Sequence, residues 1–254
     1  MPGNIQSIER AATILRLLSG RNRRLGVVDI AGEMGLPKGT VHGLLRTLQS
    51  VGFVEQDEDS GKYQLGAALL HMGSSYLDGN ELRTRALNWS DSLATRTREA
   101  VRIGTLHEDQ VLVVHHVFRP DDTLQSLDVG SLLPAHATAL GKVLLAHHPY
   151  VASALAAERL ESYTPATITD AARLERELAR VRAQGWAADI GELVPGQVSY
   201  AAPIVDRRGM TVGAMGIFGP PERLLAARQP RPDLLAYVRE GARAVSRELG
   251  AIPW

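Results

Sequence analysis

Polar side chains that could contact DNA are concentrated in one short stretch of the chain, between residues 38 and 49. Side chains of these types hydrogen-bond to base edges in the major groove, and the basic ones also bind phosphates. A solvated helix face has a similar composition, so the interpretation depends on the elements that carry these residues. The candidate DNA-binding residues are Arg23, Arg24, Lys38, Thr40, His42, Arg46, Thr47 and Gln49.

Two amphipathic helices separated by a tight turn are expected to position this stretch. Apolar residues recur at i, i+3, i+4 and i+7 in both halves of the motif. Gly35 suits the left-handed end of the first helix, and Pro37 suits the first turn of the second. Residues 27–49 therefore predict a helix-turn-helix. Its two apolar stripes are Val27, Ile30, Ala31 and Met34, then Val41, Leu44, Leu45 and Leu48.

The flanking segments predict that this motif is winged. A helix over residues 7–19, with Ser7 as its N-cap, should precede it. Its apolar face is expected to hold Ile8, Ala11, Ala12, Leu15 and Leu18. Gly52 should end the second helix of the motif, and residues 53–56 and 62–65 should form a β-hairpin after it. Phosphates would repel the acidic tip of this hairpin, so we expect the wing to flank the DNA backbone and not to enter a groove. The tip residues are Asp57, Glu58 and Asp59.

Two glycines on the presumed reading helix are unexpected. Gly39 and Gly43 each cost about 1 kcal/mol relative to alanine in a helix interior. Their spacing of four places them on the same, outward face. Either the helix backbone approaches DNA so closely that a side chain would clash, or these are surface positions that tolerate any residue.

Composition is compatible with a two-domain DNA-binding protein that lies in the cytoplasm. The 254 residues are 44% hydrophobic and 22% charged, with no cysteine for disulfides or thiolate metal sites. No apolar run reaches the length of a membrane span and no signal pattern is present, so no membrane partner is expected. The net charge is zero, yet residues 1–50 hold seven basic residues against three acidic ones. This local excess suits a dimer that presents two basic patches.

The remaining chain predicts an α+β domain. We place the DNA-binding domain, with a connecting helix over residues 66–77, at residues 1–78 and the larger domain at residues 79–254. Hairpin-linked strands framed by helices indicate helices packed on a mostly antiparallel sheet. The expected strands are residues 101–106, 111–118, 124–129, 186–189, 198–204 and 211–218, and the expected helices are residues 81–98, 138–147, 150–159, 170–184 and 232–249.

No catalytic or metal site stands out in this larger domain. The dipeptide Gly141-Lys142 lacks the other residues of a phosphate-binding loop, although the helix start near it has N–H groups that suit an anionic ligand. His115 and His116 are adjacent on a strand and should point to opposite faces. We therefore expect no catalytic residue, no bound metal and no cofactor.

Two alternative functions are left open by the residues. His136, Asp189 and Ser199 could be assembled into a catalytic triad, which would make the larger domain a metabolite-processing enzyme fused to a DNA-binding module. The chain has no Gly-x-Ser-x-Gly elbow and no cysteine nucleophile to support this. A constitutive architectural DNA binder is the other alternative, and the neutral net charge argues against it.

Motifs along nearly the whole chain resemble those of the IclR-type transcriptional regulators. The resemblance implies a DNA-binding domain, a GAF-like effector-binding domain, and assembly as a homodimer or a dimer of dimers. Within the family, KGTVHG (38–43) and HHVFRPDD (115–122) are most similar to the glycerol operon regulators of actinobacteria. The motifs that carry the family resemblance are SIERA (7–11), LPKGTVH (36–42), GFVE (52–55), YQLG (63–66), LPAHATALGK (133–142), AAPI (201–204) and GP (219–220).

The same resemblance implies an effector site and a mode of regulation. A small metabolite, with glycerol or glycerol 3-phosphate as the first expectation, would control affinity for double-stranded operator DNA, and repression relieved by the ligand is the expected sign. Many members carry small hydroxyl residues where this chain has Gly216 and Phe218, so the size and polarity of the pocket should differ. The residues placed in or beside the pocket are Ala135, His136, Asp189, Ser199, Gly216 and Phe218.

Overall fold

The computed structural model describes residues 4–20, 24–121 and 123–251. The chain divides into two compact units, Met1–Gly79 and Asn80–Trp254. Each has its own hydrophobic core, as expected when apolar faces are buried separately in two parts of a chain. We describe each unit by itself.

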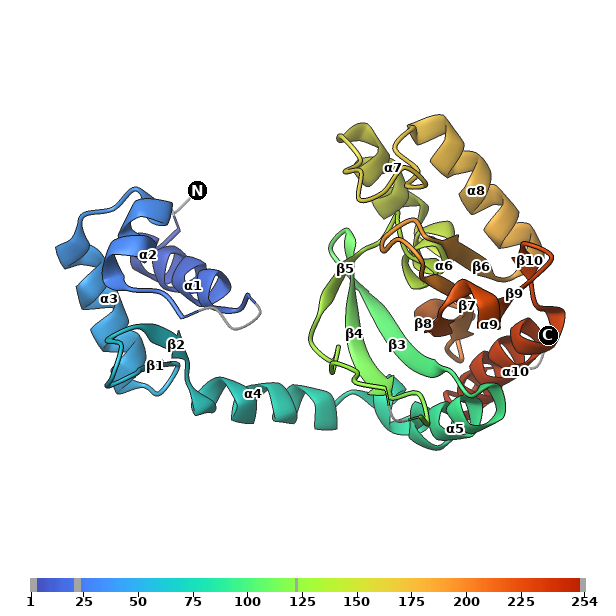
Figure 1. Cartoon of the computed structure of the whole chain (residues 1–254), viewed down its shortest axis with the longest axis horizontal. Coiled ribbons are helices and arrows are strands. Elements are labelled where there is room, and N and C mark those ends of the chain that lie inside the picture. The colour runs from blue at the N-terminus through green and yellow to red at the C-terminus, as the bar shows by residue number, and fades with distance from the viewer. Residues whose placement is uncertain (1–3, 21–23, 122, 252–254) are drawn as a thin grey trace. The chain divides into compact units, whose positions relative to one another are not determined.

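The first unit is a winged helix-turn-helix, as the periodicity predicts. Its helices and strands are α1 (Gln6–Leu18), α2 (Val27–Met34), α3 (Lys38–Ser50), β1 (Val54–Gln56), β2 (Tyr63–Leu65) and α4 (Ala67–Asp78) (Figure 1). The two predicted apolar stripes pack into one core with α1 and the hairpin. Its fully buried members include Ile30, Val41 and Leu45.

The turn between α2 and α3 has the expected backbone chemistry. Gly35 ends α2 with a positive φ of 62°, a conformation in which a Cβ would be strained. The Leu36 N–H then donates to the Ala31 carbonyl at 3.1 Å. Pro37 precedes α3 as its N-cap residue instead of lying inside its first turn.

The start of α1 differs from the prediction. The helix begins one residue before Ser7, with Ile5 at the N-cap, because the Ile5 carbonyl already accepts from the N–H groups of Ile8 and Glu9. Ile8 is 64% exposed, and Ile14, which was not placed on the predicted face, is fully buried. The rest of the predicted face largely holds, because Leu18 is buried and Ala11 and Leu15 pack against the core.

The wing is tied to the loop that precedes α2. Gln56 pairs with Tyr63 in the β1–β2 register, and Tyr63 also pairs with Leu25 through two backbone hydrogen bonds of 2.8 and 3.1 Å. Gly52 adopts a φ of 74° between α3 and the wing, as a helix-ending glycine should.

The second unit contains a six-stranded antiparallel sheet in the order β5-β4-β3-β8-β7-β6. This confirms the α+β class with a mostly antiparallel sheet. The strands are β3 (Ala100–His107), β4 (Gln110–Val117), β5 (Leu132–Pro134), β6 (Ala187–Ile190), β7 (Val198–Val205) and β8 (Thr211–Gly219).

Helices cover both faces of this sheet. On one face lie α5 (Glu81–Thr97) and α10 (Pro232–Glu248), and on the other lies α6 (Ala139–His147), with α7 (Pro149–Ala157) and α8 (Ala171–Gln184) packed outside it (Figure 1). The α6 helix is buried along nearly its whole length. Its position between the sheet and α8 explains why its sequence is apolar on nearly all sides, with Lys142 as the charged exception.

One strand prediction in this unit was wrong, and three short elements were missed. Residues 124–129 do not form a strand, because the Arg119 N–H and carbonyl bond the Gln125 side chain and close a loop instead of a ladder. The strand that pairs with β4 is β5, a few residues later. The short elements α9 (Pro221–Leu224), β9 (Leu225–Ala226) and β10 (Gln229–Pro230) were not predicted.

Over the residues that the structure describes, we find no helix with the length and apolarity needed to cross a membrane.

Candidate functional site

The outward face of α3 presents the predicted reading residues to solvent. Lys38, Thr40, His42, Arg46 and Gln49 are all exposed, while the opposite face of the same helix is buried. The sixth, Thr47, is exposed too, but its hydroxyl donates to the Gly43 carbonyl at 3.1 Å. One helix therefore separates a core face from a polar face whose side chains can reach base edges.

Gly39 and Gly43 lie on this exposed face with open space around them. A Cβ built at either position meets nothing within 4 Å. Packing inside the unit therefore does not require glycine at either position.

We expect Gly43→Ala to separate folding from DNA binding. The variant should gain up to about 1 kcal/mol in free energy of unfolding, because alanine is the better helix former, and should bind operator DNA more weakly if α3 lies against it. Gly32→Ala in α2 is the matched control, since a Cβ there also meets nothing within 4 Å. Urea denaturation and fluorescence anisotropy measure the two effects. Equal operator affinity in both variants would refute close approach of the helix backbone.

Of the two basic residues expected to contact DNA before α2, the structure describes only Arg24. Arg24 Nη1 lies 3.1 Å from Asp57 Oδ2 at the wing tip, and its side chain is 54% exposed. The wing acid thus partly neutralises the arginine that we expected to contact phosphate. Arg23 lies outside the described residues.

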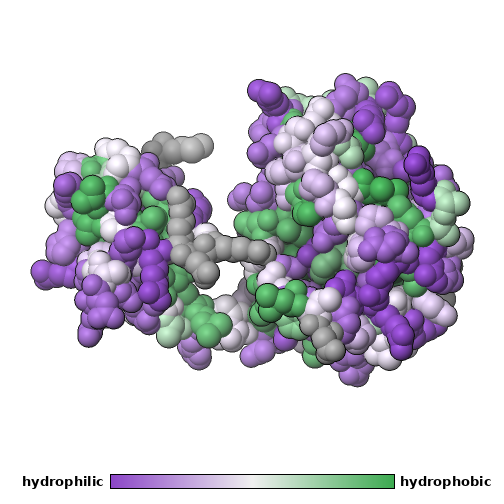
Figure 2. Space-filling model, in the orientation of Figure 1, coloured by the Kyte–Doolittle hydropathy of each residue, from purple (hydrophilic) through white to green (hydrophobic). Residues whose placement is uncertain are grey.

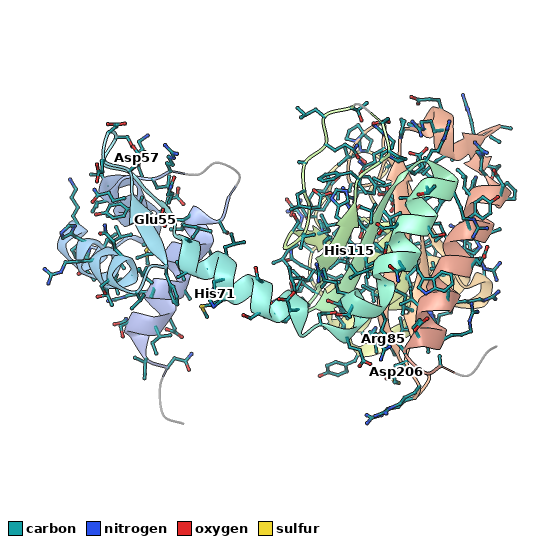
Figure 3. The ribbon with its side chains drawn as sticks, turned by 90° about the horizontal axis from the view of Figure 1, so that it is seen from below. Glu55, Asp57, His71, Arg85, His115 and Asp206 are labelled. Carbon is teal, nitrogen blue, oxygen red and sulfur yellow. The ribbon has the colours of Figure 1, made fainter. Side chains whose placement is uncertain are left out.

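Asp57 is held in place chiefly by the wing itself. Hydrogen bonds from Ser60 are the largest cause that lowers the pKa of its carboxyl, and the Arg24 charge acts in the same direction. Figure 3 shows Asp57 at the tip of the wing and Glu55 nearer to α4, where the Glu55 carboxylate accepts from the Ala67 N–H at 3.0 Å. The hydrogen bonds from Ser60 therefore fix the Asp57 carboxyl at the tip and favour its ionised form.

A small cavity in the second unit brings four predicted effector residues together. Asp189, Ser199, Gly216 and Phe218 line a space of about 20 Å³, which has room for about one water molecule. The other lining residues are Arg102, Leu133, Thr138, Ala139, Leu140, Leu193, Gln197, Tyr200 and Ile217.

Gly216 and Phe218 give this cavity a wall unlike the hydroxyl-lined one implied by the resemblance. Strands β7 and β8 approach closely at Gly216, where an added Cβ would clash with the Tyr200 carbonyl. The Phe218 ring lies under the Arg102 guanidinium, 3.4 Å from ring centroid to Cζ. The Phe218 ring therefore fills space at the cavity wall that a small hydroxyl side chain would leave open, whereas Gly216 leaves no room for a side chain at all.

Ala135 and His136 are not lining residues of the cavity. Ala135 is fully buried and packs under Gly141 in the first turn of α6. His136 Nε2 lies 2.9 Å from the Glu161 carbonyl oxygen, and its ring stacks near Tyr163. The triad considered from the sequence is therefore not assembled, because His136 bonds elsewhere and only Ser199 and Asp189 are in contact, at 3.3 Å.

Asp189 is a buried hydrogen-bond acceptor at the cavity wall. It is 3% exposed and accepts from the Glu192 N–H at 2.7 Å and from the Ser199 hydroxyl. Burial is the largest cause that raises the pKa of its carboxyl, to about 6. Because the buried carboxylate has lost most of its hydration, a hydroxyl that donates to it would stabilise the ionised form.

Behind Asp189 lies a buried ion-pair network. Lys142 is 1% exposed, and its Nζ lies 2.5 Å from Glu192 Oε1 and 3.5 Å from Glu177 Oε1. Lys142 is therefore a structural residue that joins α6 to α8 and to the loop after β6, and it does not line the cavity.

Sequence reasoning missed Arg102 and its surroundings. Arg102 Nε donates to Asp128 Oδ2 at 2.8 Å, and the Asp128 N–H donates to His116 Nδ1 at 3.1 Å. The signal was an arginine within the apolar run of β3. A charge there requires a partner, but its partner is 26 residues away in a loop.

The histidines of β4 face opposite sides of the sheet, as predicted. His116 lies near the rings of Phe118 and Phe218 on the cavity side. His115 lies on the side that α5 covers (Figure 3), where the charges of Arg83 and Asp91 act on it in opposite directions. Burial lowers the pKa of both imidazoles, which favours their neutral forms. Within the described parts of the chain, no three His, Asp or Glu residues are grouped to hold a metal ion.

Comparison with known proteins identifies the family of both units. Residues 7–58 match the IclR helix-turn-helix domain, and residues 74–247 match the C-terminal domain of bacterial IclR transcriptional regulators. The chain is 56% identical over 252 residues to the glycerol operon regulatory protein of Streptomyces coelicolor, covering 99% of both chains.

More distant relatives share the same two-part architecture. The chain is 31% identical to the transcriptional regulator XynR of Escherichia coli, with 97% of this chain and 98% of XynR covered. The crystal structure of an IclR homologue from Microbacterium hydrocarbonoxydans complexed with 4-hydroxybenzoate superimposes with a TM-score of 0.81 at 25% identity, over 96% of this chain and 99% of that one. These relatives are regulators and not enzymes. The chain therefore belongs to the IclR family of bacterial transcriptional regulators.

Proposed function

We propose that this regulator represses a glycerol operon and leaves its operator when glycerol or glycerol 3-phosphate binds in the cavity lined by Asp189 and Ser199. The observation that carries the proposal is the 56% identity, across 99% of both chains, to a glycerol operon regulatory protein. The polar groups of the cavity support it, because Asp189, Ser199 and Gln197 supply donors and acceptors for hydroxyl groups.

Operator recognition rests on the exposed face of α3. We assign base contacts to His42, Arg46 and Gln49, and phosphate contacts to Lys38 and Arg24. The side chains of Thr40 and Thr47, and that of Arg23, would add further contacts to DNA. Because phosphate contacts release counterions, affinity should fall steeply as salt is raised.

A second copy of the chain is the partner that we assign to α4. This helix has no buried residue, although Leu70, Met72 and Tyr76 are 75%, 56% and 56% exposed, and Figure 2 shows hydrophobic residues along it. Apolar surface of this kind marks an interface. A homodimer, alone or paired into a dimer of dimers, would present two reading helices to a palindromic operator.

Operator release is the measurement that tests the function. The full chain is mixed with labelled DNA from upstream of a glycerol-uptake operon, in buffer free of glycerol, and fluorescence anisotropy follows the complex. Millimolar glycerol or glycerol 3-phosphate should dissociate it, and glucose should not. If the complex forms but neither compound changes it, the glycerol assignment is wrong while the family assignment stands.

A further inference from the structure

Arg102 is the one cation among the described residues that line the effector cavity. It extends from β3, and its side chain is only 16% exposed. Burial is the largest cause that lowers the pKa of its guanidinium, and the Asp128 charge opposes this effect. An arginine stays protonated under such conditions, so the cavity wall contains a poorly hydrated positive charge.

The present partner of Arg102 does not match the geometry of the guanidinium. Nε and Nη2 lie 2.8 and 2.5 Å from the same oxygen, Asp128 Oδ2. A guanidinium edge is best matched by two oxygens, each of which accepts one N–H. A phosphate offers three oxygens and more charge than a carboxylate, so it can replace Asp128 at this edge.

The remainder of the cavity suits the rest of a polyol phosphate. Asp189, Ser199 and Gln197 provide acceptors and donors for hydroxyl groups. Ala139 and Leu140, in the first turn of α6, also line the space, and the N-terminal end of a helix favours a nearby anion.

We propose that Arg102 binds the phosphate of the effector, so that the regulator responds to a polyol phosphomonoester and not to the free polyol, with Asp128 as the internal competitor for this arginine. The inference rests on the proposed function and narrows its effector to glycerol 3-phosphate. Neutral glycerol has no charge with which to displace Asp128.

The same competition links the ligand to a loop. A cavity of about 20 Å³ is too small for glycerol 3-phosphate, so Arg102 and its neighbours must rearrange when it binds. Asp128 belongs to the segment between β4 and β5, where Leu124 is completely exposed and Leu127 is 62% exposed. Loss of the Arg102 bond releases one of the attachments of this segment, alongside the bond from the Asp128 N–H to His116.

Calorimetry on the full chain tests the proposal with two variants of opposite expected sign. Arg102→Gln should weaken binding of glycerol 3-phosphate about tenfold to a hundredfold, because a charge-assisted pair is lost. Asp128→Asn should tighten it several-fold, because the competing charge is removed while Arg102 stays. Arg96→Gln is the matched control. Arg96 also pairs with a carboxylate, Glu240 at 2.9 Å, and lies over an aromatic ring, that of Tyr237 at 4.1 Å. These contacts join α5 to α10, away from the cavity, so the variant should bind glycerol 3-phosphate like wild type.

Glycerol and glycerate are titrated beside glycerol 3-phosphate. Wild type should bind glycerol 3-phosphate at least tenfold more tightly than either. The proposal would be overturned if glycerol or glycerate bound as tightly as glycerol 3-phosphate. It would also be overturned if both Arg102→Gln and Asp128→Asn kept the wild-type affinity for glycerol 3-phosphate. Because Asp128→Asn keeps the arginine, it provides a result even if Arg102→Gln does not fold.

Operator release separates this inference from the proposed function. If glycerol 3-phosphate binds in an Arg102-dependent manner but does not release operator, the anion site is supported and the proposed function is wrong. If glycerol releases operator equally well in wild type and in Arg102→Gln, the proposed function is supported and the anion site is wrong.

Discussion

Lys142→Met should lower the free energy of unfolding by about 3–5 kcal/mol, the cost of breaking a buried ion pair on one side. Lys142 is 1% exposed, and its ammonium lies between the carboxylates of Glu192 and Glu177. Methionine fills most of the space but leaves Glu192, which is 8% exposed, without its ammonium partner. Urea denaturation measures the loss.

The double variant Lys142→Met, Glu192→Gln should recover much of this loss, because it removes the orphaned charge together with its partner. Arg182→Met, in an exposed pair with Glu175 at 2.9 Å, is the surface control and should cost less than about 1 kcal/mol. A Lys142→Met loss no larger than that of this control would contradict the structural role of Lys142.

The pH dependence of Lys142→Met has a definite sign. Burial already raises the pKa of the Glu192 carboxyl, with Lys142 opposing the shift, and removal of Lys142 raises the pKa further. A carboxyl whose pKa is higher in the folded state binds more protons there, so the folded state loses stability as pH rises through that pKa. The difference between wild type and Lys142→Met should therefore shrink as pH is lowered.

Arg46→Ala should weaken operator binding about tenfold to a hundredfold for each chain bound, because a good arginine–base contact contributes roughly 1–3 kcal/mol. Arg46 is exposed on the outward face of α3 and makes no contribution to the core of the first unit. Unfolding free energy should consequently change by less than about 0.5 kcal/mol. Anisotropy titrations at fixed salt, with a footprint of the complex, measure the effect.

Arg247→Ala is the control for Arg46→Ala. Arg247 is exposed in the last turn of α10, in the second unit. Its replacement by alanine removes the same charge from the chain. If Arg46→Ala keeps the wild-type affinity and footprint, or loses no more affinity than Arg247→Ala, then α3 does not read the operator through this side chain.

Periodicity and local chemistry determine most of the first unit. The stripe of Val41, Leu45 and Leu48 repeats at helical spacing, and burial of these residues follows directly from it. Gly35 ends α2 with the positive φ that its type allows. The reading face was therefore predictable, because the polar side of an amphipathic helix lies opposite its core side.

Where local signals compete, the sequence was less informative. The first helix was predicted with Ile8 facing inward, because Ile8 and Ile14 are both apolar and only the neighbouring helices select Ile14 for burial. Residues 124–129 look like a strand by type, but Gln125 bonds the backbone of Arg119 and holds a loop.

The cavity of the second unit and the buried ion pairs beside it depend largely on contacts between residues far apart in the chain. Asp189 and Ser199 meet because β6 and β7 pair in register, which the hairpin spacing allows one to expect. Arg102 and Asp128 are 26 residues apart, and Lys142 and Glu192 are 50 apart, so their pairing required the sheet and its loops to be in place. A charge within an apolar run says that a partner exists, because an unpaired buried charge is too costly. Only the path of the folded chain decides which residue that partner is.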